Sequence, residues 1–231
     1  MRILIIIGLF VLAYLLGSIP FGLIIVKLKN GKDLRHVESG RTGGTNAMRA
    51  AGLWAGIGTA TLDVLKGAGS VWLVKAIFPL ASNPLNAWIQ ALVPVAAILG
   101  HNYSLFLITR DEQGKLHWRG GAGGAPCLGG AFALWPVSIF IILPIGALVF
   151  YGIGFASLTT ISVGLSSLLI FVVCAITRVS PWSYAVYGML ALLFLMWSLR
   201  SNIKRLVNGT ERVVGLRAKR KEKDISERSA I

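Results

Sequence analysis

The chain has 231 residues, of which 55% are hydrophobic and 14% are charged, and its formal net charge at pH 7 is +14. Together with a mean hydropathy of +0.72, this composition excludes an ordinary soluble domain and indicates a membrane protein with several spans. Because a helix needs about 20 apolar residues to cross the hydrocarbon core, the length allows roughly seven spans at most. The predicted fold class is therefore an all-α polytopic integral membrane protein.

Seven apolar segments are predicted to cross the membrane. In chain order they are residues 3–26, 50–77, 87–108, 121–134, 136–153, 157–176 and 182–199. The first has no small-residue cleavage pattern, so we interpret it as a permanent helix and not as a signal peptide. The fourth is too short to cross unless it is tilted, re-entrant or covered by neighbours, and Pro136 and Pro144 interrupt the next run. A six-span version with a re-entrant piece remains the alternative.

Basic residues predict the orientation of these spans. They gather in the first loop, in the loop around residues 110–119 and in the tail from Lys204 onward, whereas residues 79–86 carry no charge and residues 177–181 carry only Arg178. By the positive-inside rule, seven spans then place the N-terminus outside and the C-terminus in the cytoplasm. Residues 1–207 are predicted to form one transmembrane domain. Residues 208–231 are predicted to form a basic cytoplasmic tail that adds little to the core.

The high positive charge has two interpretations. Nucleic-acid binding is one, but the charges are confined to loops on one predicted membrane face, which favours topology and attraction to anionic lipid head groups. The two cysteines, Cys127 and Cys174, fall near opposite ends of their spans, and the three histidines lack metal-ligand spacing. We therefore predict no nucleic-acid partner, no disulfide, no metal and no cofactor, and no obligate protein partner is evident.

A polar, glycine-rich loop at residues 39–49 lies between two apolar runs. Gly43 and Gly44 allow successive backbone N–H groups to turn toward one point, and Arg41 and Arg49 supply positive charge. The hydroxyl groups come from Ser39, Thr42 and Thr45. This combination is typical of a phosphate-binding loop. A solvated turn remains the other interpretation of such a loop taken alone.

Further polar clusters fall on the same predicted side of the membrane. Inside the second predicted span, Asp63 and Lys66 are three residues apart on one helical face, and they form either a structural ion pair or part of a site. The glycine run 120–124 is not a nucleotide P-loop, because no Gly-Lys-Ser/Thr follows it, and it is not a dinucleotide-binding motif, because no strand precedes it. Two interpretations remain for it: a nest of N–H groups that binds phosphate, or close packing of helices. Clusters that meet at one interface indicate one site built from several loops. A transporter would more often place them at the midplane.

Several motifs give the chain a resemblance to one family. The matching pieces, in order, are Gly17-Ser18-Ile19-Pro20, Ser39-Gly40, Gly43-Gly44-Thr45-Asn46 with Arg49, Asp63-Val64-Leu65-Lys66-Gly67, Gly100-His101, Phe106-Leu107, Gly120-Gly121, Ser157-Leu158 and Asn202-Ile203-Lys204-Arg205-Leu206. On these motifs the chain resembles the bacterial acyl-phosphate-dependent glycerol-3-phosphate acyltransferases, the PlsY family of small inner-membrane enzymes.

The resemblance implies an activity and a set of site residues. The family transfers a fatty acyl group from acyl phosphate to the 1-hydroxyl of glycerol 3-phosphate, giving lysophosphatidic acid and phosphate, without a metal or coenzyme A. By resemblance, Ser39, Ser157 and Asn202 are the expected catalytic residues. The expected substrate-binding residues are Gly43, Gly44, Thr45, Asn46, Arg49, Asp63, Lys66, His101, Arg119, Gly120 and Gly121. The alternative is a repurposed relative that binds or transports a lipid or an anionic small molecule.

The chain departs from the family pattern at a few positions. Ala122 stands where the family has a lysine in its glycine loop, Leu199 stands where a histidine is usual, and Arg41 replaces a usual asparagine. Residues 110–118 form an apparent insertion. We hypothesise that Arg41, Lys115 or Arg119 replaces the missing positive charge, because a phosphate pocket needs donors more than it needs them at one chain position.

Overall fold

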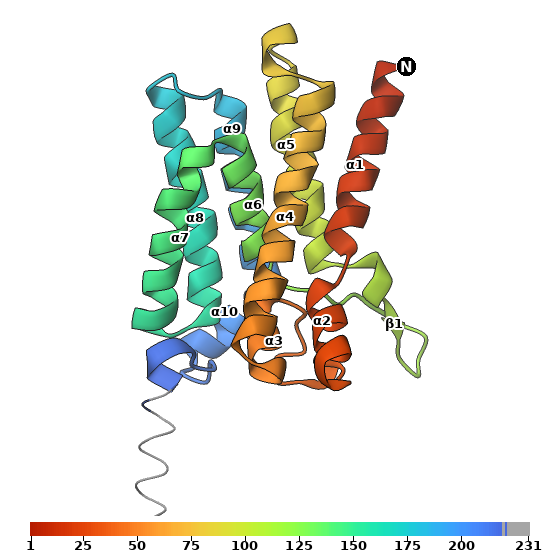
Figure 1. Cartoon of the computed structure of the whole chain (residues 1–231), viewed down its shortest axis with the longest axis vertical. Helices are drawn as coiled ribbons and strands as arrows, with labels where there is room; N and C mark the ends of the chain where they lie inside the picture. Colours follow the sequence, from red (N-terminus) through yellow and green to blue (C-terminus); the bar gives the residue numbers. More distant parts are fainter. Residues whose placement is uncertain (219, 221–231) are drawn as a thin grey trace, which may run out of the picture.

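The computed structural model describes residues 1–218 and 220, and it is predominantly helical. Most of the longer helices run side by side along the long axis (Figure 1). The α-helices are α1 (Arg2–Ser18), α2 (Phe21–Asn30), α3 (Gly44–Ala51), α4 (Leu53–Ile77), α5 (Asn86–Asn102), α6 (Gly124–Leu134), α7 (Ile139–Leu148), α8 (Ala156–Ile176), α9 (Trp182–Ser198) and α10 (Arg200–Val207). Shorter turns are the 3₁₀ helices η1 (Leu34–His36), η2 (Leu80–Ser82), η3 (Leu105–Leu107) and η4 (Pro136–Ser138), and the π-helix η5 (Val149–Ile153).

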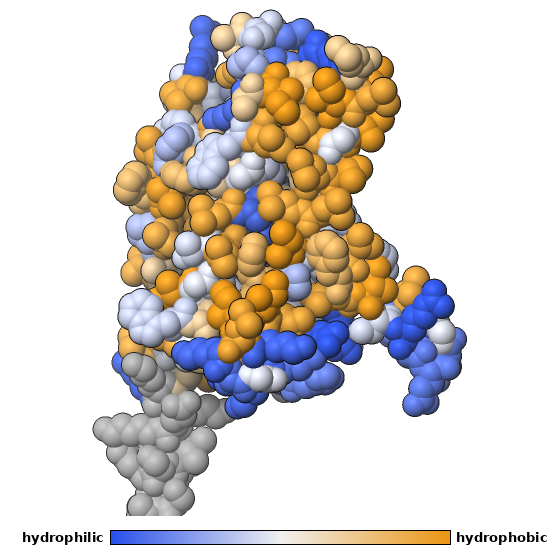
Figure 2. Space-filling model, turned by 45° about the vertical axis from the view of Figure 1, so that its right-hand side comes forward, coloured by the Kyte–Doolittle hydropathy of each residue, from blue (hydrophilic) through white to orange (hydrophobic). Residues whose placement is uncertain are grey.

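The described residues include five helical segments long and apolar enough to cross a membrane. These are Arg2–Asn30, Leu53–Ser82, Asn86–Leu107, Pro136–Ile153 and Ala156–Ile176. The pair α9 and α10, bent by 66°, makes a sixth if it is counted as one span. Hydrophobic residues cover much of the middle of the surface, and hydrophilic residues form a band at its lower end, with others at its upper end (Figure 2). The predicted all-α membrane fold is confirmed at this level.

Several of the predicted helices begin or end elsewhere, and three of them are interrupted at a proline or a glycine. The predicted run 3–26 is two helices, because Pro20 has no N–H to continue the helix and the chain is extended at Ile19. The predicted run 50–77 begins as a helix at Leu53, after Gly52 with a φ of 84°. The predicted run 121–134 begins at Gly124, after Gly123 with a φ of 88°. Both glycines have a positive φ, which interrupts a right-handed helix.

Helix α6 is the short element that the sequence predicted. Its eleven residues extend about 16 Å, roughly half the hydrocarbon thickness. The helix packs against α4, α5, α8 and α9, so protein covers it where it ends. Lys75 of α4 donates from Nζ to the carbonyl oxygens of Ala133 at 2.6 Å and Leu134 at 3.1 Å. The ammonium group therefore satisfies carbonyls that the helix end leaves open.

Glycines bring α4 and α6 into close contact. A Cβ on Gly129 would lie 1.9 Å from the carbonyl oxygen of Val64, and one on Gly67 would lie 2.2 Å from that of Pro126. Small residues of this kind let helix backbones approach closely inside a membrane. Because α6 carries the glycine loop at its N-terminus, this contact also sets the position of the loop relative to α4.

The residues of the apparent insertion form a hairpin. Strand β1 (Thr109–Arg110) pairs antiparallel with β2 (Leu116–His117), and Thr109 lies opposite His117. The hairpin projects to one side of the helices in Figure 1. Its residues follow the end of α5 and return to the glycine loop through Arg119.

The first residues of the predicted tail pack against the helices. Val214 is buried, and its N–H donates to the carbonyl oxygen of Gly154 at 2.9 Å. The Arg217 guanidinium lies over the ring of Phe155 at 4.7 Å. The expectation that the tail adds little to the core is therefore wrong for this part, because these contacts bury an apolar side chain and connect it to the turn before α8. Residues 219 and 221–231 lie outside the described residues.

We expect the Gly129→Ala substitution to destabilise the protein by about 1–3 kcal/mol, because the new methyl group overlaps a backbone carbonyl that cannot move away freely. The measurement is the midpoint of thermal unfolding in detergent. Gly8→Ala in α1 is the matched control, since a Cβ at Gly8 meets nothing within 4 Å. Equal midpoints for the two variants would contradict the close packing of α4 and α6.

A truncation after Arg212 is expected to lower the unfolding midpoint relative to a truncation after Ala218. The shorter chain loses the buried Val214 and the stacking of Arg217, whereas the longer chain keeps both contacts. A buried Val contributes roughly 1.5–3 kcal/mol by apolar burial alone. If both truncated chains unfold at the same temperature, the contacts of residues 213–217 contribute nothing to stability.

Candidate functional site

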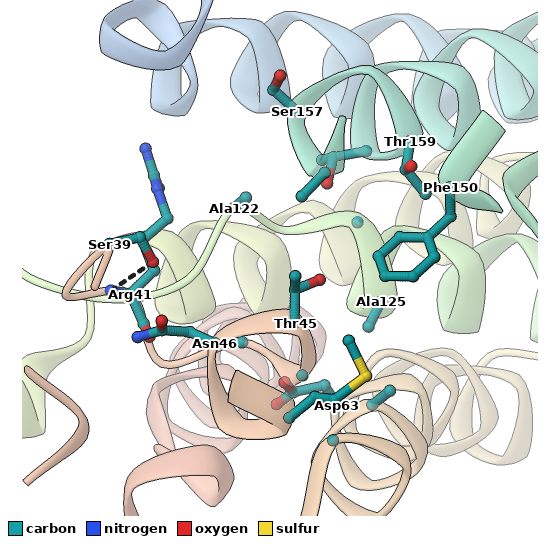
Figure 3. Close-up of a pocket in the computed structure, with 18 of the residues that line it drawn as sticks. Ser39, Arg41, Thr45, Asn46, Asp63, Ala122, Ala125, Phe150, Ser157 and Thr159 are labelled. Carbon is teal, nitrogen blue, oxygen red and sulfur yellow. Dashed lines mark hydrogen bonds between the residues drawn. The ribbon is translucent and has the colours of Figure 1, made fainter. Parts of the chain in front are cut away.

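A cavity of about 350 Å³ lies at the end of the helices where α3 and α10 are found. Its wall combines residues of α3, α4, α6, α8 and α10 with the loop before α3 and the glycine loop before α6. Figure 3 shows Ser39, Thr45 and Asp63 on one side of this space and Ser157, Thr159 and Phe150 on the other. Segments that are far apart in the sequence thus meet around one cavity, as the sequence predicted.

The loop before α3 is held in shape by Asn46. Its Nδ2 donates to the carbonyl oxygens of Val37 and Arg41, both at 2.9 Å. Helix α3 then begins at Gly44, and the first N–H groups of a helix have no intrahelical partner. These N–H groups and the positive end of the helix dipole favour an anion. The hydroxyl group of Ser39 lies in the same wall of the cavity.

Arg41 connects three segments. Its Nη1 donates to the carbonyl oxygen of Gly121 at 3.0 Å and to Ser198 Oγ at 3.2 Å. Its Nη2 donates to the carbonyl oxygen of Ser198 at 2.6 Å and to Asn202 Oδ1 at 3.1 Å. All four Nη hydrogens are therefore engaged, and Nε–H remains. Burial lowers the pKa of Arg41, and the neighbouring Arg205 lowers it further, although a guanidinium stays charged at neutral pH.

Arg49 is the second guanidinium in the wall, and it has more donors available. It donates one hydrogen bond, from Nη2 to the carbonyl oxygen of Val213 at 3.2 Å. Burial lowers its pKa too. Four of its five N–H groups make no hydrogen bond to the described residues. Such a side chain is suited to a bidentate contact with phosphate.

The balance of charge around the cavity leaves two arginines uncompensated. Other charged groups are paired: Arg205 with Glu211 at 3.4 Å, Arg212 with Glu38 at 3.3 Å, and Lys66 with Asp63 at 2.8 Å. Within the described part of the chain, neither Arg41 nor Arg49 forms an ion pair with a carboxylate. The cavity thus has an excess of positive charge where the N-terminus of α3 also points.

Asp63, Lys66 and His101 form a buried cluster at the inner side of the cavity. Lys66 Nζ lies 2.8 Å from Asp63 Oδ1 and 2.9 Å from His101 Nδ1, and it donates to the carbonyl oxygen of Ile19 at 3.1 Å. Asp63 and His101 belong to the cavity wall, whereas Lys66 lies behind them. The ion pair of Asp63 and Lys66 therefore has two contacts: Lys66 binds the chain at the break between α1 and α2, and Asp63 lines the cavity.

Part of the wall is apolar. Side chains of Leu53, Ile57, Leu128, Phe150 and Tyr151 line it, and Leu53, Ile57 and Tyr151 are exposed. A cavity that joins positive charge and N–H donors to an apolar wall suits an amphipathic ligand with an anionic head and an alkyl chain.

Comparison with known proteins agrees with this geometry. The family model described as glycerol-3-phosphate acyltransferase matches residues 7–209. The chain belongs to the glycerol-3-phosphate acyltransferase family. It is 36% identical over 206 residues to a glycerol-3-phosphate acyltransferase of Thermus thermophilus, and the match covers 89% of this chain and 94% of the relative. The enzyme of that name from Nostoc sp. is 36% identical over 220 residues, covering 88% of this chain and 89% of the relative.

Two solved structures share the fold. They are crystal structures of PlsY (YgiH), an integral membrane glycerol 3-phosphate acyltransferase. The glycerol 3-phosphate form has a TM-score of 0.74 and 31% identity, covering 91% of this chain and 96% of that one. The lysophosphatidic acid form has a TM-score of 0.73 and 29% identity with the same coverage. This chain is therefore a multi-pass membrane protein of the acyltransferase family.

Most residues that the sequence predicted as site residues do meet around the cavity. Those in its wall are Ser39, Gly43, Gly44, Thr45, Asn46, Arg49, Asp63, His101, Ser157 and Asn202. Four others are not in the wall. Lys66 lies behind Asp63, and Gly120 and Gly121 contribute backbone oxygens that bind Thr42 N and Arg41. Arg119 is exposed, and its carbonyl oxygen accepts from the N–H of Ser104 at 3.0 Å, away from the cavity wall.

Sequence reasoning missed many residues of the wall, among them Arg205, Glu211, Arg212, Phe150 and Tyr151. Arg205 belongs to the motif Asn202-Ile203-Lys204-Arg205-Leu206, from which only Asn202 was predicted as a site residue. The basic side chain of Arg205 in that motif could have indicated a site residue. Glu211 and Arg212 fall in the predicted tail and had no such signal. Phe150 and Tyr151 were interpreted as part of an apolar span, and only the π-helical turn that places them beside α8 brings them to the cavity.

The family departures also lie in or near this wall. Ala122 and Leu199 both line the cavity, and their short or alkyl side chains offer no donor there. Among the three proposed replacements, Arg41 is in the wall and binds the glycine loop, whereas Lys115 and Arg119 are exposed. The geometry thus favours Arg41 as the residue that supplies the missing positive charge to the part of the wall near Ala122 and Leu199.

The Arg41→Lys substitution is expected to lower the free energy of unfolding by about 1–3 kcal/mol. An ammonium group cannot donate the four hydrogen bonds of the two guanidinium Nη atoms, so it leaves buried acceptors unpaired. Thermal unfolding in detergent measures the loss. Arg119→Lys is the control, and we expect no change for it. A stable Arg41→Lys protein would contradict the role of this guanidinium in joining the three segments.

Proposed function

We propose that this chain transfers a fatty acyl group from acyl phosphate to the 1-hydroxyl of glycerol 3-phosphate, releasing lysophosphatidic acid and inorganic phosphate. The observation that carries the proposal is the cavity in which Arg41 and Arg49 lack carboxylate partners among the described residues, next to the N-terminus of α3, and whose wall also has an apolar part. Both substrates have an anionic phosphate, and the donor has an alkyl chain. The names of the relatives support the acceptor and the product.

In this proposal Arg49 binds phosphate with its available N–H groups, and Arg41 adds charge from the other side. Ser39, Ser157 and Asn202 act at the reaction centre. Ser157 Oγ is buried in the wall and has no hydrogen-bond partner among the described residues, so it has a donor to offer. Acyl phosphate is already activated, and the protein therefore has to align the hydroxyl with the carbonyl carbon and stabilise the oxyanion. Gly43, Gly44 and Thr45 complete the phosphate site.

The proposed membrane arrangement follows from the positions of the polar segments. Seven spans are obtained if α6 counts as one, with the N-terminus outside and the C-terminus in the cytoplasm. Helices α3 and α10 lie at the end opposite the N-terminus (Figure 1), which supports a site facing the cytoplasm of a bacterial inner membrane. A soluble anionic acceptor would reach the site there, and the donor would arrive with its chain in the lipid.

The test is phosphate release and lysophosphatidic acid formation by the purified protein in a lipidic phase. Palmitoyl phosphate is supplied with and without glycerol 3-phosphate, and palmitoyl coenzyme A is supplied in parallel. We expect release from palmitoyl phosphate that requires the acceptor, and no transfer from the coenzyme A ester. Arg49→Ala is expected to lower kcat/KM by about 10²–10³-fold, because a charged donor to phosphate is removed from the cavity.

Arg110→Ala is the matched control, since this arginine is exposed on the hairpin and lies outside the cavity wall. We expect its kcat/KM to equal that of the wild type. Binding of glycerol 3-phosphate without turnover of either donor, by protein that unfolds cooperatively, would contradict the proposal and favour a relative that binds or transports the ligand.

A further inference from the structure

A second cavity lies at the end of the bundle that carries the N-terminus. It has a volume of about 370 Å³, and its wall joins the ends of α4 and α6 to α5, α9 and the chain between α8 and α9. Helix η2 and the chain between α8 and α9 both lie at that end (Figure 1). Asp63 lines the first cavity and Lys75 lines this one, and about 18 Å of helix α4 separates the two residues. The two cavities are therefore distinct.

This cavity exists because α6 is short. The helix ends at Leu134, whereas α4 and α5 continue further toward the end that carries the N-terminus (Figure 1). Leu134 and Trp135 line the cavity at the point where α6 ends. A helix that crossed the whole hydrocarbon core would occupy this space, and without it polar side chains of the neighbouring helices reach a cavity.

Lys75 brings a positive charge to this cavity that no carboxylate balances within the described part of the chain. Its Nζ donates to the carbonyl oxygens of Ala133 at 2.6 Å and Leu134 at 3.1 Å. An ammonium group has three hydrogens, and the third makes no hydrogen bond to a described residue. None of the ion pairs among the described residues includes Lys75. A half-buried cation at the end of a membrane span therefore has both a charge and a donor to offer.

The other polar side chains of the wall divide into satisfied and unsatisfied groups. Tyr184 donates from its hydroxyl group to Gln90 Oε1 at 2.6 Å, and Gln90 Nε2 donates to the carbonyl oxygen of Phe78 at 2.8 Å. Ser180 lines the cavity too, and its Oγ is buried with no hydrogen-bond partner among the described residues. Buried hydroxyl groups are normally hydrogen-bonded. Lys75 and Ser180 thus require acceptors, and an anion with several oxygens supplies them.

Aromatic side chains place the cavity at the level of the lipid head groups. Trp88 lies in the first turn of α5 and Trp182 begins α9, and both are exposed. Exposed tryptophans of a membrane protein gather at the interface between membrane and water. Leu80 and Val179, which line the cavity, are 44% and 58% exposed. A ligand at this level therefore meets hydrogen-bond donors together with exposed apolar side chains.

We propose that this cavity binds the phosphate group of an anionic membrane lipid, with Lys75 and Ser180 as its donors. The alkyl chains of the lipid lie against exposed apolar side chains such as Leu80 and Val179. The lipid has to carry a net negative charge, because a zwitterionic head group brings its own cation and leaves Lys75 unbalanced. The site is separate from the cavity of the proposed acyl transfer, so the inference holds independently of that function.

The test uses a phosphatidylglycerol analogue with a photoreactive group on its glycerol head, added to the full-length protein in detergent. After illumination, the label is measured on the peptide that contains Leu134 and Trp135. We expect labelling of this peptide that unlabelled phosphatidylglycerol suppresses. Phosphatidylcholine and inorganic phosphate at the same concentration should suppress it at least about tenfold less effectively, because the first lacks net charge and the second lacks alkyl chains.

Variants of Lys75 separate the charge from the hydrogen bonds to α6. Lys75→Gln keeps N–H donors for the carbonyl oxygens but has no charge, and we expect about tenfold less labelling at a low concentration of the analogue. Lys75→Arg keeps the charge and should label within about threefold of the wild type. Lys27→Gln is the matched control, since this lysine is exposed and lies outside the cavity. We expect wild-type labelling for it.

Ser180→Ala covers the case in which Lys75→Gln does not fold. The hydroxyl group of Ser180 makes no hydrogen bond to the described residues, so its loss should leave the unfolding midpoint unchanged. Labelling should fall by about three- to tenfold, because one donor to the phosphate is lost. If labelling is the same in the wild type, Lys75→Gln and Ser180→Ala, the site is overturned. Equal suppression by phosphatidylcholine would overturn the need for a net negative charge, and equal suppression by inorganic phosphate would overturn the assignment to a lipid.

Discussion

Every helix that ends inside an apolar bundle leaves carbonyl oxygens that need a hydrogen-bond donor, and two lysines of α4 supply that donor here. Lys66 binds the carbonyl of Ile19 at the break between α1 and α2, and Lys75 binds the carbonyls of Ala133 and Leu134 at the end of α6. These breaks allow α2 to diverge from α1 and allow α6 to be short. The loops that form the site can then enter from several directions, and α4 is the element that joins them.

The site itself depends on a division of tasks among charged groups. Arg41 uses its four Nη hydrogens to hold the glycine loop and the junction of α9 and α10, so it acts mainly through charge and position. Arg49 has most of its donors available. Lys66 forms an ion pair with Asp63 and hydrogen bonds with Ile19 and His101. The result is a cavity whose wall joins hydrogen-bond donors and positive charge to an apolar part, a pattern suited to a ligand with an anionic head and an alkyl chain.

Much of the fold and of the site could be predicted from the sequence. Long apolar runs predicted the helices because membrane burial imposes their length, and the residues between Ser39 and Arg49 predicted an anion site because glycine, hydroxyl and arginine side chains favour phosphate. Helix starts were less predictable, since Gly52 and Gly123 adopt positive-φ conformations that depend on local contacts. The placement of Glu211 and Val214 was missed because a basic, polar segment gives no periodic signal, although it returns to the bundle and pairs with Gly154 and Arg205.

The sequence by itself determined the class of protein, the identity of the polar loops and the family, because hydropathy and ordered motifs are properties of the chain and need no contacts to be recognised. Only the tertiary structure decided which of the basic residues face the cavity. Arg41, Lys115 and Arg119 are equivalent as cations in the sequence. In space Arg41 alone of these three reaches the cavity wall, because the packing of α3 on α4 directs its loop inward, whereas the hairpin and its flank carry the other two outward.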